Sequence, residues 1–196
     1  MSGAPIIYAR VTAYLIIACW MVYLSYWIVS ARFRKQAAER QDWAGFVANR
    51  IPTTIGGLLL FWPALWRPLA VRVTPDSAPV GFLAVAVCAG GVLLAIWSRR
   101  TLADNWSFTV EFKVGHELVE KGPYRYVRHP IYTGILLLCL GTALFGARLG
   151  SWLGFAFLCL GFWIKLRQEE VLLTRHFPAE YPGYQARVKA LIPFVW

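Results

Sequence analysis

Five long stretches of this chain contain no Asp, Glu, Lys or Arg, and they constrain its fold more than any other feature. They are residues 11–31, 51–66, 77–98, 129–147 and 149–164, all rich in aliphatic and aromatic side chains. A helix needs about 20 mostly apolar residues to cross the hydrocarbon core of a bilayer, and about 17 can suffice. The second and fifth stretches reach this length if a flanking cation extends to the headgroups. We therefore predict an all-α, polytopic membrane protein with five transmembrane helices.

The composition agrees with this prediction. The chain is 58% hydrophobic and only 15% charged, whereas soluble domains carry roughly 25% charged residues. The net charge of +10 could by itself suggest a nucleic-acid-binding protein. The positions of the cations give a different explanation, set out next, and we expect no nucleic-acid partner.

The Lys and Arg residues are distributed unevenly between the two sides of the predicted bundle. Of the 20, sixteen lie in segments 32–50, 99–128 and 165–189, which five successive spans place on the same side. Cytoplasmic loops carry such an excess, so we predict an external N-terminus and a cytoplasmic C-terminus, in a bacterial inner membrane or the endoplasmic reticulum. The first stretch lacks a preceding basic region and is predicted to be a transmembrane helix rather than a signal peptide.

The chain shows no internal repeat or long flexible linker, which favours one membrane domain over residues 1–196. Residues 1–100 supply three transmembrane helices, and residues 101–196 carry the polar segments with functional potential. Only Arg148 separates the last two apolar stretches, and residues 146–151 leave room only for a tight turn, so we predict an antiparallel helical hairpin there. The cytoplasmic C-terminal tail is predicted to begin as a helix.

The first block of potentially functional residues spans 116–134. Gly122-Pro123 is a turn signal, and Pro130 disfavours the α-helical region for His129 while suiting the first turn of a helix. The fourth transmembrane helix should therefore begin at Pro130, with free N–H groups suited to an anionic group. An ordinary membrane boundary also concentrates Tyr and Arg. We prefer that explanation for Arg125 and Tyr126, and a functional one for His129 and Tyr132.

The second block begins where the fifth apolar stretch ends. On a continuing helix, Lys165 and Glu169 are four residues apart and Arg167 and Glu170 three apart, so each charge pair shares a face. These pairs could simply be weak ion pairs at a solvated helix end. The predicted hairpin, however, brings both glutamates close to Pro130, where adjacent carboxylates need cations or a ligand to offset their charge.

No metal site and no disulfide is predicted. The four cysteines lie in apolar stretches without Cys-x-x-Cys spacing, and the three histidines have no metal-ligand spacing. Phosphate-binding loops and alternating strands and helices are also absent from the sequence, which excludes a Rossmann-type cofactor domain.

Taken together, the two blocks resemble the isoprenylcysteine carboxyl methyltransferase family, and more loosely the phospholipid methyltransferases. The resemblance covers about residues 104–196. The shared pattern, in order, is His116-x-Leu118-Val119, Gly122-x-Tyr124, Arg128-His-Pro-x-Tyr132-x-Gly134, an apolar hairpin, Glu169-Glu170-x-x-Leu173, Phe177 and Tyr181-x-x-Tyr184. The resemblance implies an integral membrane enzyme that takes a methyl group from S-adenosyl-L-methionine.

The resemblance also implies roles for individual residues. Those expected around the cofactor are His116, Leu118, Val119, Tyr124, His129, Pro130, Tyr132, and Glu169 or Glu170. A family Arg before the Glu pair is implicated in holding the substrate carboxylate, and Arg167 is our candidate, with Lys165 as the alternative and Arg128 as a further cation. Arg167 and Glu170 are the expected catalytic residues.

The acceptor is less constrained than the cofactor. A carboxylate is already nucleophilic at pH 7 and needs a cation to orient it, whereas an amine or thiol must lose a proton. The scarcity of candidate bases beyond His129 and the two glutamates therefore favours a carboxylate. The resemblance implies that this carboxylate belongs to a lipophilic, prenylcysteine-like acceptor, which could reach the site from the bilayer. Transfer to a phospholipid amine or a small thiol is an alternative. A different class of explanation is a non-catalytic membrane protein whose arginines and aromatic residues anchor it or contact a partner.

Overall fold

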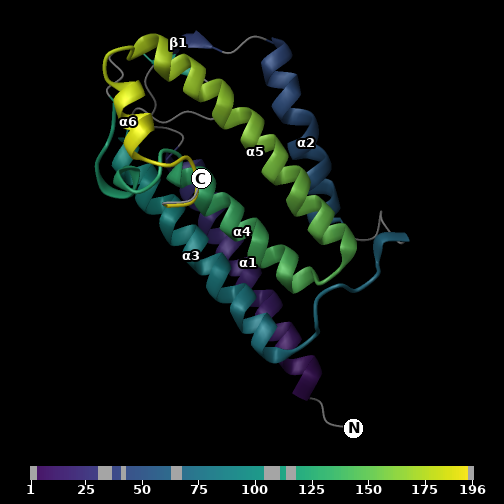
Figure 1. Ribbon diagram of the computed structural model, residues 1–196. Helices are drawn as coiled ribbons and strands as arrows, with labels where there is room; N and C mark the ends of the chain where they lie inside the picture. The colour runs from purple at the N-terminus through teal and green to yellow at the C-terminus, as the bar shows by residue number, and fades with distance from the viewer. Residues whose placement is uncertain are drawn as a thin grey trace.

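The computed structural model describes residues 4–30, 37–40, 43–62, 68–103, 111–113 and 118–193. Within these ranges the protein is a bundle of long helices with smaller elements at one end (Figure 1). The helices are α1 (Ala4–Ser30), α2 (Trp43–Phe61), α3 (Ala78–Leu102), α4 (Pro130–Gly146), α5 (Leu149–His176) and α6 (Tyr181–Arg187), with a 3₁₀ turn, η3 (Gly122–Arg125). The described residues also form one antiparallel two-stranded ribbon, β1 (Ala37–Arg40) with β2 (Glu111–Lys113).

The prediction of a helical, multi-pass membrane protein agrees with these elements, except for the short ribbon, which the all-α prediction missed. Among the described helices, four are long and apolar enough to cross a membrane, namely α1, α2, α3 and α5. Helix α4 has 17 residues and is also apolar. A fifth span through α4 therefore stays a prediction.

Helix α2 lies earlier in the chain than the predicted stretch 51–66. It covers Trp43–Phe61 and contains both Arg50 and Pro52. The predicted transmembrane stretch begins after Arg50 because a charged residue is expected to mark the membrane boundary. In the structure the Arg50 guanidinium lies 5.1 Å from the centre of the Phe46 ring, so the helix accommodates the cation along its side. It ends before Pro63, as residues that precede a proline disfavour helical backbone.

Glycines allow a close approach within two pairs of helices, α3 with α4 and α2 with α5. Helix α4 packs mainly against α3, and α5 mainly against α2. A Cβ on Gly134 would lie 2.7 Å from the carbonyl oxygen of Gly91, and one on Gly56 would lie 2.7 Å from that of Gly154. Small residues are favoured at helix contacts in membranes because dispersion forces act only at short range.

Two residues, Ala147 and Arg148, connect α4 to α5. The helix axes then separate with distance from this turn (Figure 1), because each helix has its main partner elsewhere in the bundle. The connection in the predicted hairpin is thus short, and the two helices lie farther apart at the opposite end. There the buried side chain of Leu166 on α5 packs with Ala190 and Leu191 of the C-terminal segment.

The C-terminal segment folds back onto the start of α4. The backbone amides of Arg128 and His129 donate to the carbonyl oxygens of Lys189 and Ala190, at 2.8 and 3.0 Å. This pairing brings together the beginning of α4, the end of α5 and the chain after α6. All of the site described next lies at this end of the bundle.

Candidate active site

The bend at His129 and Pro130 is held rigidly in place. Pro130 begins α4, as predicted, and His129 precedes it in a non-helical conformation with φ −123° and ψ 58°. The side chain of Thr133, one turn later, donates to the carbonyl oxygen of Leu191 at 2.8 Å. Both residues of the bend are buried, so the His129 ring has a fixed direction.

Glu170 lies opposite this bend. Its Oε1 atom accepts from Nε and Nη2 of Arg128, at 2.8 and 2.5 Å, and lies 3.2 Å from Nε2 of His129. The side chains of Arg128 and Glu170 are only 9% and 5% exposed. Arg128 also donates to the backbone carbonyl oxygens of Gln185 and Val188. This is a buried ion pair whose remaining hydrogen-bonding groups are mostly satisfied, the condition for such a pair to be tolerated.

Glu169 has a different environment from its neighbour. Its Oε2 atom accepts a hydrogen bond from the Tyr132 hydroxyl at 2.6 Å and lies 3.6 Å from Nδ1 of His129. Its side chain is 36% exposed. His129 therefore lies between the two carboxylates, and Glu169 is the more accessible of them.

Two rings and a cation pack around Tyr132, which donates to Glu169. The rings of His129 and Tyr132 are parallel, with centres 5.4 Å apart and an interplanar angle of 3°. Phe162 packs on the other side of the tyrosine, with ring centres 5.3 Å apart. The Lys165 ammonium lies 5.2 Å from the centre of the Tyr132 ring, within the range of a cation–π contact.

Three buried tyrosines support the site from η3 and α6. The Tyr184 hydroxyl donates to the Tyr124 carbonyl oxygen at 2.6 Å. Burial raises the pKa of Tyr124 well above its usual value, and the nearby Glu169 carboxylate adds to the shift. Burial also raises the pKa of Tyr181, with a further contribution from Glu170. These phenols therefore stay neutral at pH 7 and add no negative charge beside the glutamates.

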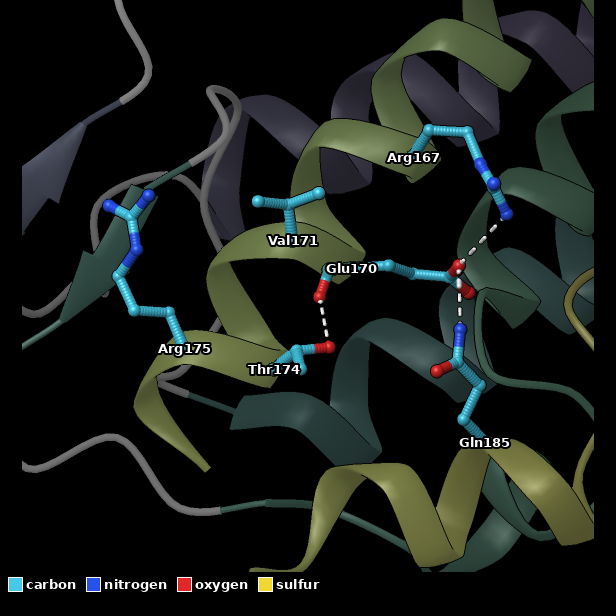
Figure 2. Close-up of a pocket in the computed structure, with 6 residues that line it drawn as sticks. All are labelled: Arg167, Glu170, Val171, Thr174, Arg175 and Gln185. Atoms are coloured by element: carbon cyan, nitrogen blue, oxygen red, sulfur yellow. Dashed lines mark hydrogen bonds and ion pairs between the residues drawn. The ribbon is translucent and has the colours of Figure 1, made fainter. Parts of the chain in front are cut away.

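A cavity of about 460 Å³ opens between α5 and α6. It is lined by Arg167, Glu170, Val171, Thr174, Arg175 and Gln185 (Figure 2). Figure 2 shows Arg167 and Gln185 converging on the Glu170 carboxylate from different helices. Nη1 of Arg167 is 4.0 Å from Oε2 of Glu170, and Nε2 of Gln185 donates to the same oxygen at 3.2 Å. Glu170 thus contacts both His129 and two residues that line this cavity.

The structure brings together most of the residues that the sequence singled out. His129, Pro130, Tyr132, Glu169 and Glu170 form one cluster, with Arg128, Tyr124 and Lys165 in contact with it or close by. Arg167 lies on the cavity side, with its side chain 62% exposed. Leu118 and Val119 are half-buried just before η3. His116 lies outside the described residues.

Sequence reasoning missed two contributors to the cluster. Gln185 contacts Glu170, and Phe162 packs on Tyr132. Neither had a distinguishing signal, since one is an ordinary amide in a polar tail and the other an apolar residue within an apolar stretch. Sequence reasoning also did not anticipate that Arg128 would be buried, because an Arg beside a membrane segment is usually exposed to headgroups.

Comparison with known proteins identifies the domain that carries this cluster. The model of the phospholipid methyltransferase family matches residues 80–180. This chain belongs to that family. The matched region extends from α3 to the end of α5, so the family domain includes the bend at Pro130 and both glutamates.

Individual relatives match between about half and two thirds of this chain. The chain is 37% identical over 111 residues to protein-S-isoprenylcysteine O-methyltransferase of Saccharomyces cerevisiae, which covers 53% of this chain and 46% of the relative. It is 35% identical over 111 residues to protein-S-isoprenylcysteine O-methyltransferase B of Arabidopsis thaliana, a match that covers 53% of this chain and 56% of that relative. An uncharacterized protein of Bacillus subtilis, YpbQ, is 28% identical over 125 residues, 63% of this chain and 73% of its own. The chain thus spans about half the length of these named methyltransferases.

Proposed function

We propose that this protein is an integral membrane methyltransferase that uses S-adenosyl-L-methionine to methylate the carboxylate of a lipophilic, prenylcysteine-like acceptor. The observation that carries the proposal is the position of His129 between the Glu169 and Glu170 carboxylates, 3.6 and 3.2 Å away. This cluster lies at one end of an apolar helix bundle, where a water-soluble cofactor and a membrane-bound acceptor can meet. Family membership and the named relatives support the reaction class.

The residues of the site fit a cationic sulfonium cofactor. When bound, S-adenosyl-L-methionine supplies a methyl group on a positively charged sulfur, and transfer to a carboxylate oxygen leaves two neutral products. Glu169 is the carboxylate best placed to attract that charge, because Glu170 is already paired with Arg128. The Tyr132 ring, parallel to that of His129 and half-buried beside Glu169, would offer an aromatic surface to the cofactor. Tyr124 and the half-buried pair Leu118 and Val119 would extend the binding surface toward η3.

A carboxylate acceptor needs a cation to orient it and no general base. Arg167 is the candidate, since its guanidinium is exposed at the cavity and close to the Glu170 carboxylate. Lys165 is the alternative, being directed at Tyr132 instead. Glu170 would fix the direction of Arg167 through their 4.0 Å contact. Positioning of this kind can supply much of the rate of a transfer reaction.

The acceptor's hydrocarbon chain would approach from the bilayer. Four described helices are suited to cross a membrane, and the site lies at one end of the bundle that they form. With five spans and the observed excess of cations on one side, the site would face the cytoplasm, in an inner membrane or the endoplasmic reticulum.

Transfer to the amine of a phospholipid is the second candidate. It is favoured by the family model itself, which is that of phospholipid methyltransferases. An amine acceptor must lose a proton, and His129 between two carboxylates is the side chain placed to accept it. The two candidates therefore predict different chemical products from the same site.

Two experiments test the proposal. Isothermal titration of detergent-purified protein with S-adenosyl-L-homocysteine should give saturable binding, and Glu169→Gln combined with Glu170→Gln should weaken binding of S-adenosyl-L-methionine. No heat change at millimolar ligand would contradict a methyltransferase and favour a non-catalytic membrane protein. Transfer of labelled methyl groups to candidate acceptors then separates the products, because methyl esters release methanol in base and methylamines do not.

A further inference from the structure

A pair of amide side chains connects α2 to α5 immediately before the two glutamates. Nδ2 of Asn49, on α2, donates to Oε1 of Gln168 at 3.0 Å. Nε2 of Gln168 in turn donates to the Gly45 carbonyl oxygen at 2.9 Å, and Nδ2 of Asn49 donates to the same oxygen at 3.1 Å. Asn49 is only 5% exposed. We call Asn49, Gln168 and the Gly45 carbonyl the amide clasp.

The other contacts between α2 and α5 constrain the rotation of α5 about its own axis less than the amide clasp does. The rest of the interface is made by closely packed glycines and apolar side chains, since a Cβ on Gly161 would lie 2.4 Å from Cγ2 of Thr53 and one on Gly56 would lie 2.8 Å from Cγ of Leu158. Dispersion contacts between smooth helix faces have little directional preference, whereas hydrogen bonds require a defined angle. The clasp is therefore the directional element of this helix contact.

The clasp lies next to the two glutamates in the sequence, so it affects how their side chains are oriented. Gln168 precedes Glu169 and Glu170 on the same helix, so a rotation of α5 displaces all three side chains together. Helix α5 packs mainly on α2 and much less on α4. The clasp thus lies on the supporting side of α5, while Glu169 meets Tyr132 and His129 of α4 on the other side.

We propose that Asn49 and Gln168 are positioning residues, which fix the rotation of α5 so that Glu169 is directed at the cofactor. This inference rests on the proposed function and extends it to a residue of α2, outside the region that the family model matches. Neither residue needs to touch the cofactor. A small displacement of a group that binds charge is enough to lower affinity.

Alanine substitutions test the clasp directly. Asn49→Ala and Gln168→Ala should each weaken S-adenosyl-L-methionine binding by about 3- to 20-fold, the range expected for one hydrogen bond between membrane helices. The double variant should weaken binding by less than the product of the two single effects, because both substitutions remove the hydrogen bond between Asn49 and Gln168. Binding unchanged from wild type in both single variants would overturn the proposal.

A side-chain exchange separates positioning from general damage. Asn49→Gln alone makes the amide pair too long and Gln168→Asn alone makes it too short, so each should weaken binding. The exchanged double variant keeps both amides and the combined length of the two side chains, and it should recover binding to within about threefold of wild type. Additive loss in that variant would contradict a direct pairing.

A matched control and a ligand-free measurement complete the test. Thr12→Ala removes another fully buried polar side chain, hydrogen-bonded within α1 and packed against Gly81 near the start of α3, and it should leave binding unchanged. Hydrogen exchange in protein without ligand should become faster over residues 165–176 in Asn49→Ala but not in Thr12→Ala. Unchanged exchange there would overturn the clasp whether or not the wild type binds ligand, whereas faster exchange without binding would contradict only the proposed function.

Discussion

The guanidinium of Arg128 donates two hydrogen bonds to Oε1 of Glu170, at 2.8 and 2.5 Å, across 42 residues of sequence. This ion pair links the residue before the α4 bend to the end of α5, where the two helix axes have separated (Figure 1). Because Glu170 is engaged in this pair, Glu169 is the adjacent glutamate that remains to face a ligand. The predictions below follow from this division between the two carboxylates.

Arg128→Ala should destabilise the protein strongly. It leaves the Glu170 carboxylate buried without its main cation, and breaking a buried pair in this way costs about 3–5 kcal/mol. The melting temperature of the detergent-purified protein should fall by about 6 °C or more. Arg125→Ala is the control, since Arg125 is exposed on the neighbouring η3. Equal melting temperatures for the two variants would show that the ion pair contributes little.

Glu169→Gln should weaken binding of S-adenosyl-L-methionine more than binding of S-adenosyl-L-homocysteine. The first ligand carries the sulfonium charge and the second does not, so only the first loses an attraction of roughly 1 kcal/mol or more, about fivefold in affinity. Glu170→Gln serves as the comparison and should mainly lower stability, because Glu170 pairs with Arg128. The same loss for both ligands in Glu169→Gln would assign the sulfonium to another group.

Arg167→Ala should raise the KM for a carboxylate acceptor by about 10- to 100-fold, the value of a charge-assisted hydrogen bond. Cofactor affinity and melting temperature should change little, because this side chain is 62% exposed. Arg175→Ala is a matched control, since Arg175 is an exposed arginine lining the same cavity. If Lys165→Ala raises KM and Arg167→Ala does not, Lys165 holds the acceptor.

Gly91→Ala should disrupt the contact between α3 and α4. The added Cβ would lie 2.5 Å from the Gly134 carbonyl oxygen, and overpacking of this kind costs about 1–3 kcal/mol. Thermal unfolding measures the effect. Gly90→Ala changes the preceding residue, where an added Cβ meets nothing within 4 Å, and should be tolerated. A tolerated Gly91→Ala would mean that the two helices can move apart at low cost.

Much of the fold follows from the sequence alone, because local properties define it. Uncharged stretches of sufficient length predict membrane helices whatever surrounds them, and Pro130 defines a helix start through its own ring geometry. Helix α5 continues from Leu149 to His176. The prediction that Arg167 and Glu170, three residues apart, share a face of this helix is therefore confirmed. The two motif blocks were sufficient to indicate the family.

Tertiary structure decided which helices pair and which polar groups meet. Hydropathy shows that a helix is apolar but not which helix it packs against, so it cannot show that α4 pairs with α3 and α5 with α2. The close approach of Gly91 and Gly134 favours the first pair through shape. The burial of Arg128 and the pairing of Asn49 with Gln168 likewise depend on segments far apart in sequence. The strength of such contacts comes from distance and burial, which arise only when the chain is folded.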